Sequence, residues 1–216
     1  MLVNEVISKK MLKEAGINVT DTRLAASREE VVTLSRELGF PVVLKIVSPD
    51  IMHKTDAGGV RVGLRNEADI RRGYREICEN ALKFRPQAEI IGVEIQRLAS
   101  GRECILGVNR DQQLGHLIMF GMGGIYTEVM KDVSFRLAPV SIQDAESMVR
   151  EIKGFPVLAG TRNEKPSDIR AIEECLLRLS QLVTDFPDIL EIDINPLMVG
   201  EVGDGGVAVD CRMIIS

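Results

Sequence analysis

The chain has few of the residues that mark several common protein classes. It contains no tryptophan, and aromatic residues make up only 4% of it, so stacking platforms for single-stranded nucleic acid are not expected. A net charge of -5 and the lack of a basic block also argue against a nucleic-acid partner. No apolar run approaches the length of a membrane span, and the N-terminal residues predict an amphipathic helix rather than a signal peptide. We therefore expect a cytoplasmic protein that works without nucleic acid or a membrane.

Cysteine and histidine are also scarce. The four cysteines are far apart and form no CxxC pair, and the two histidines lie nowhere near them, so a zinc site is not expected. The cysteines instead predict reduced and mostly buried thiols. These cysteines are Cys78, Cys104, Cys175 and Cys211, and the histidines are His53 and His116.

The order of helix and strand signals predicts an α/β (α+β) fold. A length of 216 residues suits one large domain or two closely packed lobes, and we find no internal repeat or long linker. Helices are expected to begin at five capping residues: Asn4, Ser27, Asn66, Ser141 and Ser167. Strands are expected at about 42–47, 60–64, 89–96, 102–108, 115–120, 188–194 and 206–209, with 102–108 and 115–120 forming an antiparallel hairpin.

The most informative stretch is HKTDAGGV at residues 53–60, which follows the apolar strand with its one lysine, Lys45. A lysine in a buried strand is costly unless an anion meets it. Gly58 and Gly59 would let backbone N–H groups approach a phosphate. The pattern therefore predicts a nucleotide phosphate site, although Lys45 could also be an edge-strand lysine with its ammonium in solvent.

His53 precedes Lys54 in this stretch, and the lysine would stabilise phosphate charge beside it. An imidazole is a competent nucleophile near neutral pH, so His53 could carry a phosphoryl group. The alternative is a loop histidine bonded to the backbone. His116 lies in an apolar strand without a glycine loop around it, so it is not a second candidate.

Two further segments are candidates for ligand contacts. The residues EIQRL at 94–98 run from a strand end into a turn and could meet an adenine edge, or Glu94 and Gln96 could be surface polar residues. The glycine-rich turn at 121–124 could bind an anion or be a flexible turn.

A third segment, EIDINP at 191–196, predicts a metal site. Side chains alternate along a strand, which places Glu191, Asp193 and Asn195 on one face and turns Ile192 and Ile194 toward the core. Three oxygen-bearing side chains suit Mg²⁺ with nucleotide phosphates, and Asp210 at the end of the partner strand could complete the ligand set. The alternative is a solvated strand face.

Four segments together resemble one known family. They are FPVVLK at 40–45, HKTDAGGV at 53–60, FGMGGI at 120–125 and EIDINPL at 191–197. In this order they resemble the β subunit of ADP-forming acetyl-CoA synthetases, which is an ATP-grasp domain, and the resemblance extends from the N-terminal helix to Asp210. The segment AGTRN at 159–163 departs from the family's usual G-Y-R-G, which affects only the surface near Arg162.

The resemblance implies a single ATP-grasp domain over residues 1–216, with two lobes of mixed sheets that grip a nucleotide. The smaller lobe would span about 20–92, and the larger lobe 1–19 plus 93–216. The reaction would be acyl-CoA + ADP + phosphate ⇌ carboxylic acid + CoA + ATP. A CoA-binding α subunit would hold the first phosphohistidine, and the phosphoryl group would be relayed to ADP on this chain with Mg²⁺.

The resemblance also implies roles for individual residues. His53 would be the phosphohistidine of this subunit, with Glu191 or Asp193 orienting it, and Asn195 and Asp210 would bind Mg²⁺. Glu103 matches the acidic residue of a family G-x-E pattern. The expected nucleotide contacts are Lys45, Lys54, Gly58, Gly59, Glu94, Gln96, Leu98 and Glu103.

Two alternatives stay open at the sequence level. One is an ATP-binding regulatory domain of an acyl-CoA synthetase-like acetyltransferase, and the other is a succinyl-CoA synthetase-type β subunit. The presence of Lys45, His53, Asn195 and Asp210 together favours catalysis over ligand binding alone.

Overall fold

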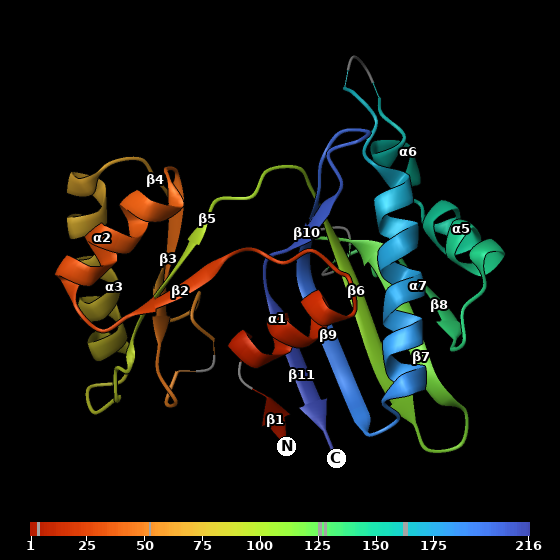
Figure 1. Cartoon of the computed structure of the whole chain (residues 1–216), viewed down its shortest axis with the longest axis horizontal. Coiled ribbons are helices and arrows are strands. Elements are labelled where there is room, and N and C mark those ends of the chain that lie inside the picture. The colour runs from red at the N-terminus through yellow and green to blue at the C-terminus, as the bar shows by residue number, and fades with distance from the viewer. Residues whose placement is uncertain (4, 52, 125–126, 128, 162–163) are drawn as a thin grey trace. The chain divides into compact units, whose positions relative to one another are not determined.

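A computed structural model describes residues 1–3, 5–51, 53–124, 127, 129–161 and 164–216 (Figure 1). The chain divides into a larger unit, Met1–Val19 with Ala99–Ser216, and a smaller unit, Thr20–Leu98. The sequence placed the end of the smaller lobe at about residue 92, but β5 (Gly92–Arg97) pairs with two strands of the smaller unit and extends it to Leu98. The predicted cap Asn4, Ile125 of the glycine-rich turn and Arg162 lie outside the described residues.

The smaller unit is a four-stranded antiparallel sheet with two helices on one face. Its strand order is β2-β5-β3-β4. Ser27 caps the first helix by accepting a hydrogen bond from the Glu30 amide, and Asn66 caps the second by accepting one from the Asp69 amide. Besides β5, the elements are β2 (Thr22–Ala25), α2 (Arg28–Leu38), β3 (Val42–Val47), β4 (Val60–Leu64) and α3 (Glu67–Phe84).

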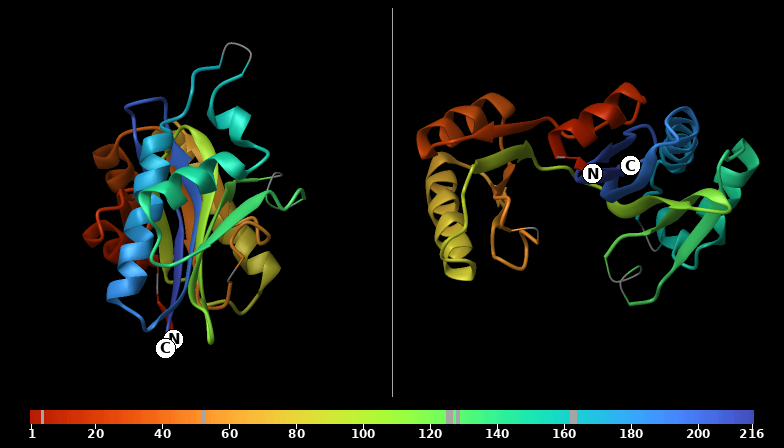
Figure 2. Two further views of the ribbon diagram at one scale, coloured as in Figure 1. Left: turned by 90° about the vertical axis from the view of Figure 1, so that its right-hand side faces the viewer. Right: turned by 90° about the horizontal axis from the view of Figure 1, so that it is seen from below.

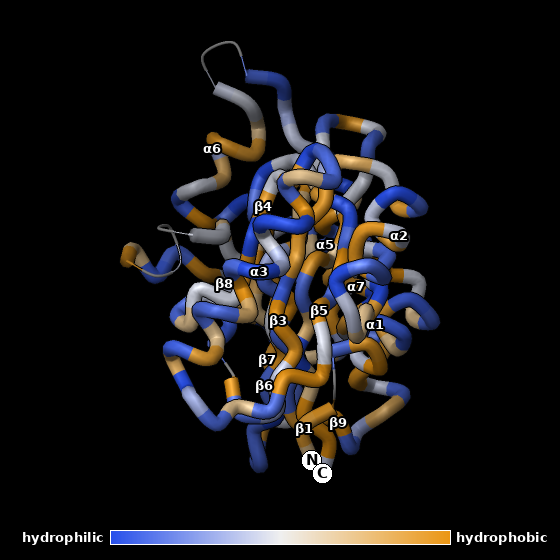
Figure 3. The backbone as a smooth tube through the Cα atoms, turned by 90° about the vertical axis from the view of Figure 1, so that its left-hand side faces the viewer, coloured by the Kyte–Doolittle hydropathy of each residue, from blue (hydrophilic) through white to orange (hydrophobic). Residues whose placement is uncertain are grey.

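The core of the smaller unit lies between the sheet and these helices. Leu44 and Ile46 of β3 pack there with Ile70 and Ile77 of α3 and Ile95 of β5. The tube in Figure 3 is orange along most of β3, because nearly all of its residues are apolar. Alternation then leaves Lys45 on the opposite face of the sheet.

The larger unit is a seven-stranded sheet in the order β1-β11-β9-β6-β7-β8, with β10 paired to β9. Every ladder between named strands is antiparallel in both units, so the expectation of mixed sheets is wrong; one isolated parallel bridge joins Val19 and Ala208. Parallel neighbours need long crossovers, whereas β6, β7 and β8 follow one another as an antiparallel meander. The strands are β1 (Leu2–Val3), β6 (Arg102–Asp111), β7 (Gly115–Met122), β8 (Val133–Leu137), β9 (Ile189–Val199), β10 (Gly206–Ala208) and β11 (Cys211–Ile215).

Helices of the larger unit pack on one side of its sheet. Figure 2 shows α1 and α7 on the same side, and buried Leu12, Met148 and Leu176 from three helices share a core with Phe120 and Ile192 from the strands. We call the other side of this sheet, which carries Asp193, the open face. The helices are α1 (Glu5–Glu14), α5 (Ile142–Glu151), α6 (Phe155–Leu158) and α7 (Ile169–Asp185).

Of the predicted caps in the larger unit that the structure describes, Ser141 is confirmed and Ser167 is wrong. Ser141 and Asp144 form a reciprocal capping box at α5. At α7 the cap is Asp168 rather than Ser167, because the Asp168 carboxylate accepts a hydrogen bond from the Ala171 amide, whereas Ser167 is buried. Among the described residues, no helix combines the length and the apolar character that crossing a bilayer requires.

Candidate functional site

In the smaller unit, two lysines converge on one buried carboxylate. Lys45 of β3 is 5% exposed and lies directly opposite Glu94 of β5, which is 4% exposed. Residues directly opposite each other share a face of the sheet. The Lys54 ammonium lies 3.6 Å from the Glu94 carboxylate. Because β3 is an inner strand and Lys45 is buried, the interpretation of Lys45 as an edge-strand lysine in solvent is excluded.

Gln96 lies on the same face of β5, and its side chain joins two strands. It is 1% exposed, and its side-chain oxygen accepts hydrogen bonds from the hydroxyl groups of Thr20 at 3.2 Å and Thr22 at 3.4 Å. The Leu98 amide donates to the Pro41 carbonyl at 3.0 Å. The surface-polar interpretation of Glu94 and Gln96 is therefore wrong, and adenine contact by residues 94–98 stays a prediction.

The loop that carries His53 is closed by its own backbone. The Gly58 amide donates to the Thr55 carbonyl at 2.9 Å, and the Gly59 amide donates to the Lys54 carbonyl at 2.8 Å. Both predicted phosphate donors are thus engaged inside the loop. His53 itself is exposed, and a phosphohistidine role for it stays a prediction.

Packing explains why these two positions are glycines. Gly58 has a φ of +61°, which other residues rarely adopt. A Cβ at Gly59 would lie 2.4 Å from Cγ2 of Ile46, so the loop approaches β3 more closely than any side chain allows. The glycines serve loop geometry in this structure, and phosphate contact by their amides stays a prediction.

In the larger unit, β9 shows the predicted alternation. Ile192 and Ile194 are 1% and 0% exposed in the core, while Glu191 and Asp193 are half-buried on the open face. Arg212 of β11 lies directly opposite Asp193. Burial and the neighbouring Glu191 raise the pKa of Asp193, and the positive charge of Arg212 offsets part of this rise.

Asn195 and Asp210, the predicted magnesium ligands, are neighbours across adjacent segments of the chain. The Asn195 amide donates to the backbone carbonyl of Asp210 at 3.3 Å. A side-chain amide oxygen and a carboxylate are hard donors of the kind that Mg²⁺ takes. Within the described ranges, His, Cys, Asp and Glu form no group of three that would hold a metal. This donor set fits Mg²⁺, which commonly uses one or two protein ligands together with nucleotide phosphates.

Glu103 of β6 supports the second glycine-rich turn. The Gly123 amide donates to the Glu103 carbonyl at 2.8 Å, and a Cβ at Gly123 would lie 2.7 Å from Cβ of Glu103. A Cβ at Gly124 would lie 3.9 Å from a carboxylate oxygen of Glu103. The described part of this turn is therefore packed against Glu103, which brings a predicted contact residue and a predicted turn together.

Two cavities of the larger unit lie away from these residues. A cavity of about 520 Å³ lies between α1 and α7, and Met11, Leu182 and Phe186 are among the residues that line it. A second cavity of about 520 Å³ includes Asp168 and Gly203. Neither is lined by a predicted site residue. Phosphate chemistry needs charge and hydrogen-bond donors, so a cavity without the predicted polar residues is not a candidate for it.

Sequence reasoning missed Arg212, although CRMII at 211–215 alternates directly after Asp210 and is a strand signal. His116, the other histidine, is 9% exposed, and its Nε2 lies 2.7 Å from the Ile189 carbonyl oxygen. That ring is buried and hydrogen-bonded, so His53 stays the candidate for a phosphoryl acceptor among the two histidines.

Comparison with known proteins gives the family. Residues 1–215 match the family model of the ATP-grasp domain. The chain is 48% identical over 209 residues to the β subunit of ADP-forming acetate–CoA ligase I from Pyrococcus furiosus, which covers 96% of this chain and 89% of that one. It is 46% identical over 206 residues to the ADP-forming 4-hydroxybutyrate–CoA ligase of Nitrosopumilus maritimus, covering 95% of this chain and 30% of that longer one.

Solved structures agree with these relatives. The dinucleotide-forming acetyl-coenzyme A synthetase 1 of Ca. Korarchaeum cryptofilum, in complex with coenzyme A, Ca-AMPCP and HgCl+, matches with a TM-score of 0.94 and 47% identity. That match covers 100% of this chain and 93% of the other. The chain therefore belongs to the ATP-grasp family and, within it, to the β subunits of ADP-forming acetate–CoA ligases.

Proposed function

We propose that this chain is the nucleotide-binding subunit of an ADP-forming acyl-CoA synthetase, in which His53 passes a phosphoryl group to ADP. The observation that carries this proposal is the pair of lysines around Glu94 beside a loop that presents an exposed histidine. The overall reaction would be acyl-CoA + ADP + phosphate ⇌ carboxylic acid + CoA + ATP.

Charge neutralisation is the main chemical task in such a transfer. Lys45 and Lys54 bring two positive charges to one carboxylate, which leaves a net positive charge for nucleotide phosphates. Lys54 directly follows His53, so its ammonium can stay near a phosphoryl group held on the imidazole. Carrying the group on His53 divides one long transfer into two shorter ones, with the imidazole nitrogen forming and then losing the bond to phosphorus.

Asn195 and Asp210 would hold Mg²⁺, which neutralises charge on nucleotide phosphates when it is bound. Glu191 and Asp193 supply carboxylates on the open face for an imidazole that must be oriented. Glu103, Gln96 and Leu98 complete the set of residues for which we propose nucleotide contacts.

A CoA-binding partner chain is part of this proposal. The chain contains two histidines, and His116 is held in the core, so the first phosphoryl acceptor has to come from elsewhere. One Korarchaeum structure contains coenzyme A, acetyl-coenzyme A and a phosphorylated phosphohistidine segment. Four free cysteines fit a reducing compartment, which agrees with the cytoplasmic location that we propose.

The test is His53→Asn, assayed with the CoA-binding partner chain. We expect this change to abolish ATP formation and to leave Mg-ADP affinity nearly unchanged, because asparagine keeps a polar side chain but cannot carry the phosphoryl group. The wild-type chain should hold an acid-labile, alkali-stable phosphoryl label at His53. Full turnover by His53→Asn, or the label on another residue, would overturn the relay.

A further inference from the structure

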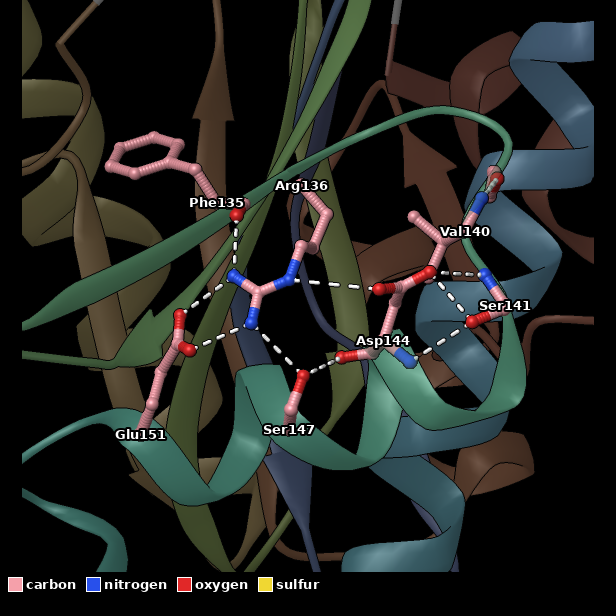
Figure 4. Close-up of polar contacts among 8 residues, drawn as sticks. Phe135, Arg136, Val140, Ser141, Asp144, Ser147 and Glu151 are labelled. Atoms are coloured by element: carbon pink, nitrogen blue, oxygen red, sulfur yellow. Dashed lines mark hydrogen bonds and ion pairs between the residues drawn. The ribbon is translucent and has the colours of Figure 1, made fainter.

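Strand β8 turns polar side chains toward the helices of its unit and apolar side chains outward, which is the reverse of the usual arrangement. Ser134 is 3% exposed, and Arg136 is directed at α5, as Figure 4 shows. Phe135 and Leu137 alternate with them and are each 45% exposed on the open face. A sheet strand normally turns its apolar side chains to the core, so this strand leaves apolar surface uncovered in the described structure.

Arg136 is what holds the strand in this orientation. Its guanidinium donates to the two carboxylate oxygens of Glu151 at 2.9 and 2.7 Å and to the Ser147 hydroxyl at 2.9 Å (Figure 4). Such a two-point contact fixes the geometry more firmly than a single ion pair does. The outward placement of Phe135 and Leu137 is therefore built in, and the surface they form is already in place before a partner arrives.

Rows of paired residues connect the exposed apolar side chains of β8 with the acidic residues of β9. Phe135 pairs with Met119, Met119 with Gly107, and Gly107 with Asp193. In antiparallel ladders, directly opposite residues share a face, so this is one continuous row. Gly107 has no side chain, and Met119 fills that space instead: a Cβ at Gly107 would lie 3.2 Å from Cε of Met119.

A second row runs beside the first. Leu137 pairs with Leu117, Leu117 with Asn109, and Asn109 with Glu191. The open face thus changes from apolar on β7 and β8 to acidic on β9. We call the four apolar residues at the β8 end, Leu117, Met119, Phe135 and Leu137, the apolar patch.

We propose that the apolar patch docks the CoA-binding partner chain, through an apolar segment of that chain that lies next to its phosphoryl-carrying histidine. This inference rests on the proposed function, because it uses Glu191 and Asp193 as the acids beside which phosphoryl transfer takes place. A partner that covers both ends of the rows has to be apolar at one end and has to bring an imidazole or a cation to the other. A second copy packed about a two-fold axis so as to cover both ends would place its carboxylates over the apolar patch, where they would lose their hydration without a partner charge.

The position and composition of the apolar patch are also typical of a protein interface. β8 is an edge strand, and an edge with outward apolar side chains invites unspecific strand pairing unless something covers it. Val129 and Met130, just before the strand, are 71% and 53% exposed and extend the apolar surface along the chain. Aromatic and methionine side chains are the types that are enriched at the centres of protein interfaces.

The experiment compares two Phe→Ser variants of this chain. Phe135→Ser removes the ring from the patch, and Phe186→Ser removes a ring of similar exposure, 55%, from the side of the α1–α7 cavity. Calorimetric titration with the purified CoA-binding partner chain should show about ten-fold or more weaker binding for Phe135→Ser, as expected for a buried aromatic anchor. Phe186→Ser should bind like wild type. Both variants should bind Mg-ADP with unchanged affinity, which shows that they are folded.

Unchanged partner affinity for Phe135→Ser, or a loss only for Phe186→Ser, would overturn the docking site. Self-association of the wild-type chain that Phe135→Ser abolishes, with partner affinity unchanged, would assign the patch to a second copy and would also overturn it. Leu137→Ser provides a second variant on the neighbouring row. Because these affinities are measured without turnover, a wild-type complex that binds but makes no ATP would count against the proposed function alone.

Discussion

Gly59→Ala is a direct test of how the His53 loop is built. The added Cβ would lie 2.4 Å from Cγ2 of Ile46, 3.2 Å from its Cβ and 3.1 Å from the Lys54 carbonyl oxygen. Ile46 is fully buried between the sheet and its helices, so its side chain has no open space to move into. The loop or β3 has to shift instead.

The expected loss follows from the size of this overlap. Forcing one extra methyl group into a packed core typically costs about 1–3 kcal/mol. For a chain of this length, each kcal/mol lowers the melting temperature by about 2–4 °C. Alanine keeps the backbone amide, so a role of Gly59 as a phosphate donor alone would leave the ligand-free stability unchanged. The packing role and the phosphate-donor role of Gly59 therefore predict different stabilities for the nucleotide-free variant.

The assay is urea unfolding of the ligand-free chain, with a double-mutant cycle as control. Ile46→Ala removes Cγ2, the atom that the new methyl group would meet, at the cost of a cavity. The double variant should therefore be more stable than the sum of the two single losses predicts, by about 1 kcal/mol or more. A Gly59→Ala stability within about 0.5 kcal/mol of wild type, or strict additivity in the cycle, would refute the packing argument.

Other contacts give further expected outcomes. Lys45→Met should weaken Mg-ADP binding by about ten-fold or more in calorimetry, because a charge-assisted contact contributes about 1.5–3 kcal/mol, and equal affinities would contradict the phosphate role. Burial raises the pKa of Cys104, Cys175 and Cys211 to about 12, so iodoacetamide at about pH 8 should leave these thiols unlabelled in the native chain and label them in urea; rapid native labelling would show that the thiols are accessible. The hydrogen bonds from Arg136 lower the pKa of Glu151, so this pair stabilises the fold above the ordinary pKa of 4.5 and loses its effect as the pH falls below it. Glu151→Gln should accordingly lose less stability than wild type between about pH 5 and pH 3, and parallel curves would argue against the pair.

Local signals predicted much of the fold. β3 and β4 have the predicted bounds, and the hairpin of β6 and β7 is present, because periodicity and turn residues act over short distances. The helix caps Ser27, Asn66 and Ser141 were predicted for the same reason. The strands β1, β2, β8 and β11 were missed: they are short, and unlike the equally short β4 and β10 they have no glycine next to them that marks a boundary. The strand expected at 89–96 begins only at Gly92 and runs to Arg97.

The residues of the candidate site could also be predicted where a local signal marks them, and not where their position depends on distant parts of the chain. Polar residues that interrupt an apolar strand can be recognised in the sequence, and Lys45 and the Glu191 and Asp193 pair were found by that signal. The opposition of Asp193 and Arg212 depends on the register between two strands, which no local pattern gives. The use of the Gly58 and Gly59 amides inside the loop depends on how the loop closes, so the glycines alone suggested an open anion site.

Strand β8 shows why an alternating pattern can predict a strand and still assign its faces wrongly. In VSFRL at 133–137 the apolar residues would be placed in the core by pattern alone. The orientation is decided instead by α5, whose Ser147 and Glu151 bind Arg136 and so draw the polar face of the strand inward. If the two faces of the strand were exchanged, Phe135 and Leu137 would be buried and the contact of Arg136 with α5 would be lost. The chain forgoes that burial by itself and recovers it when a second chain covers the outer face, which agrees with the partner chain that we propose.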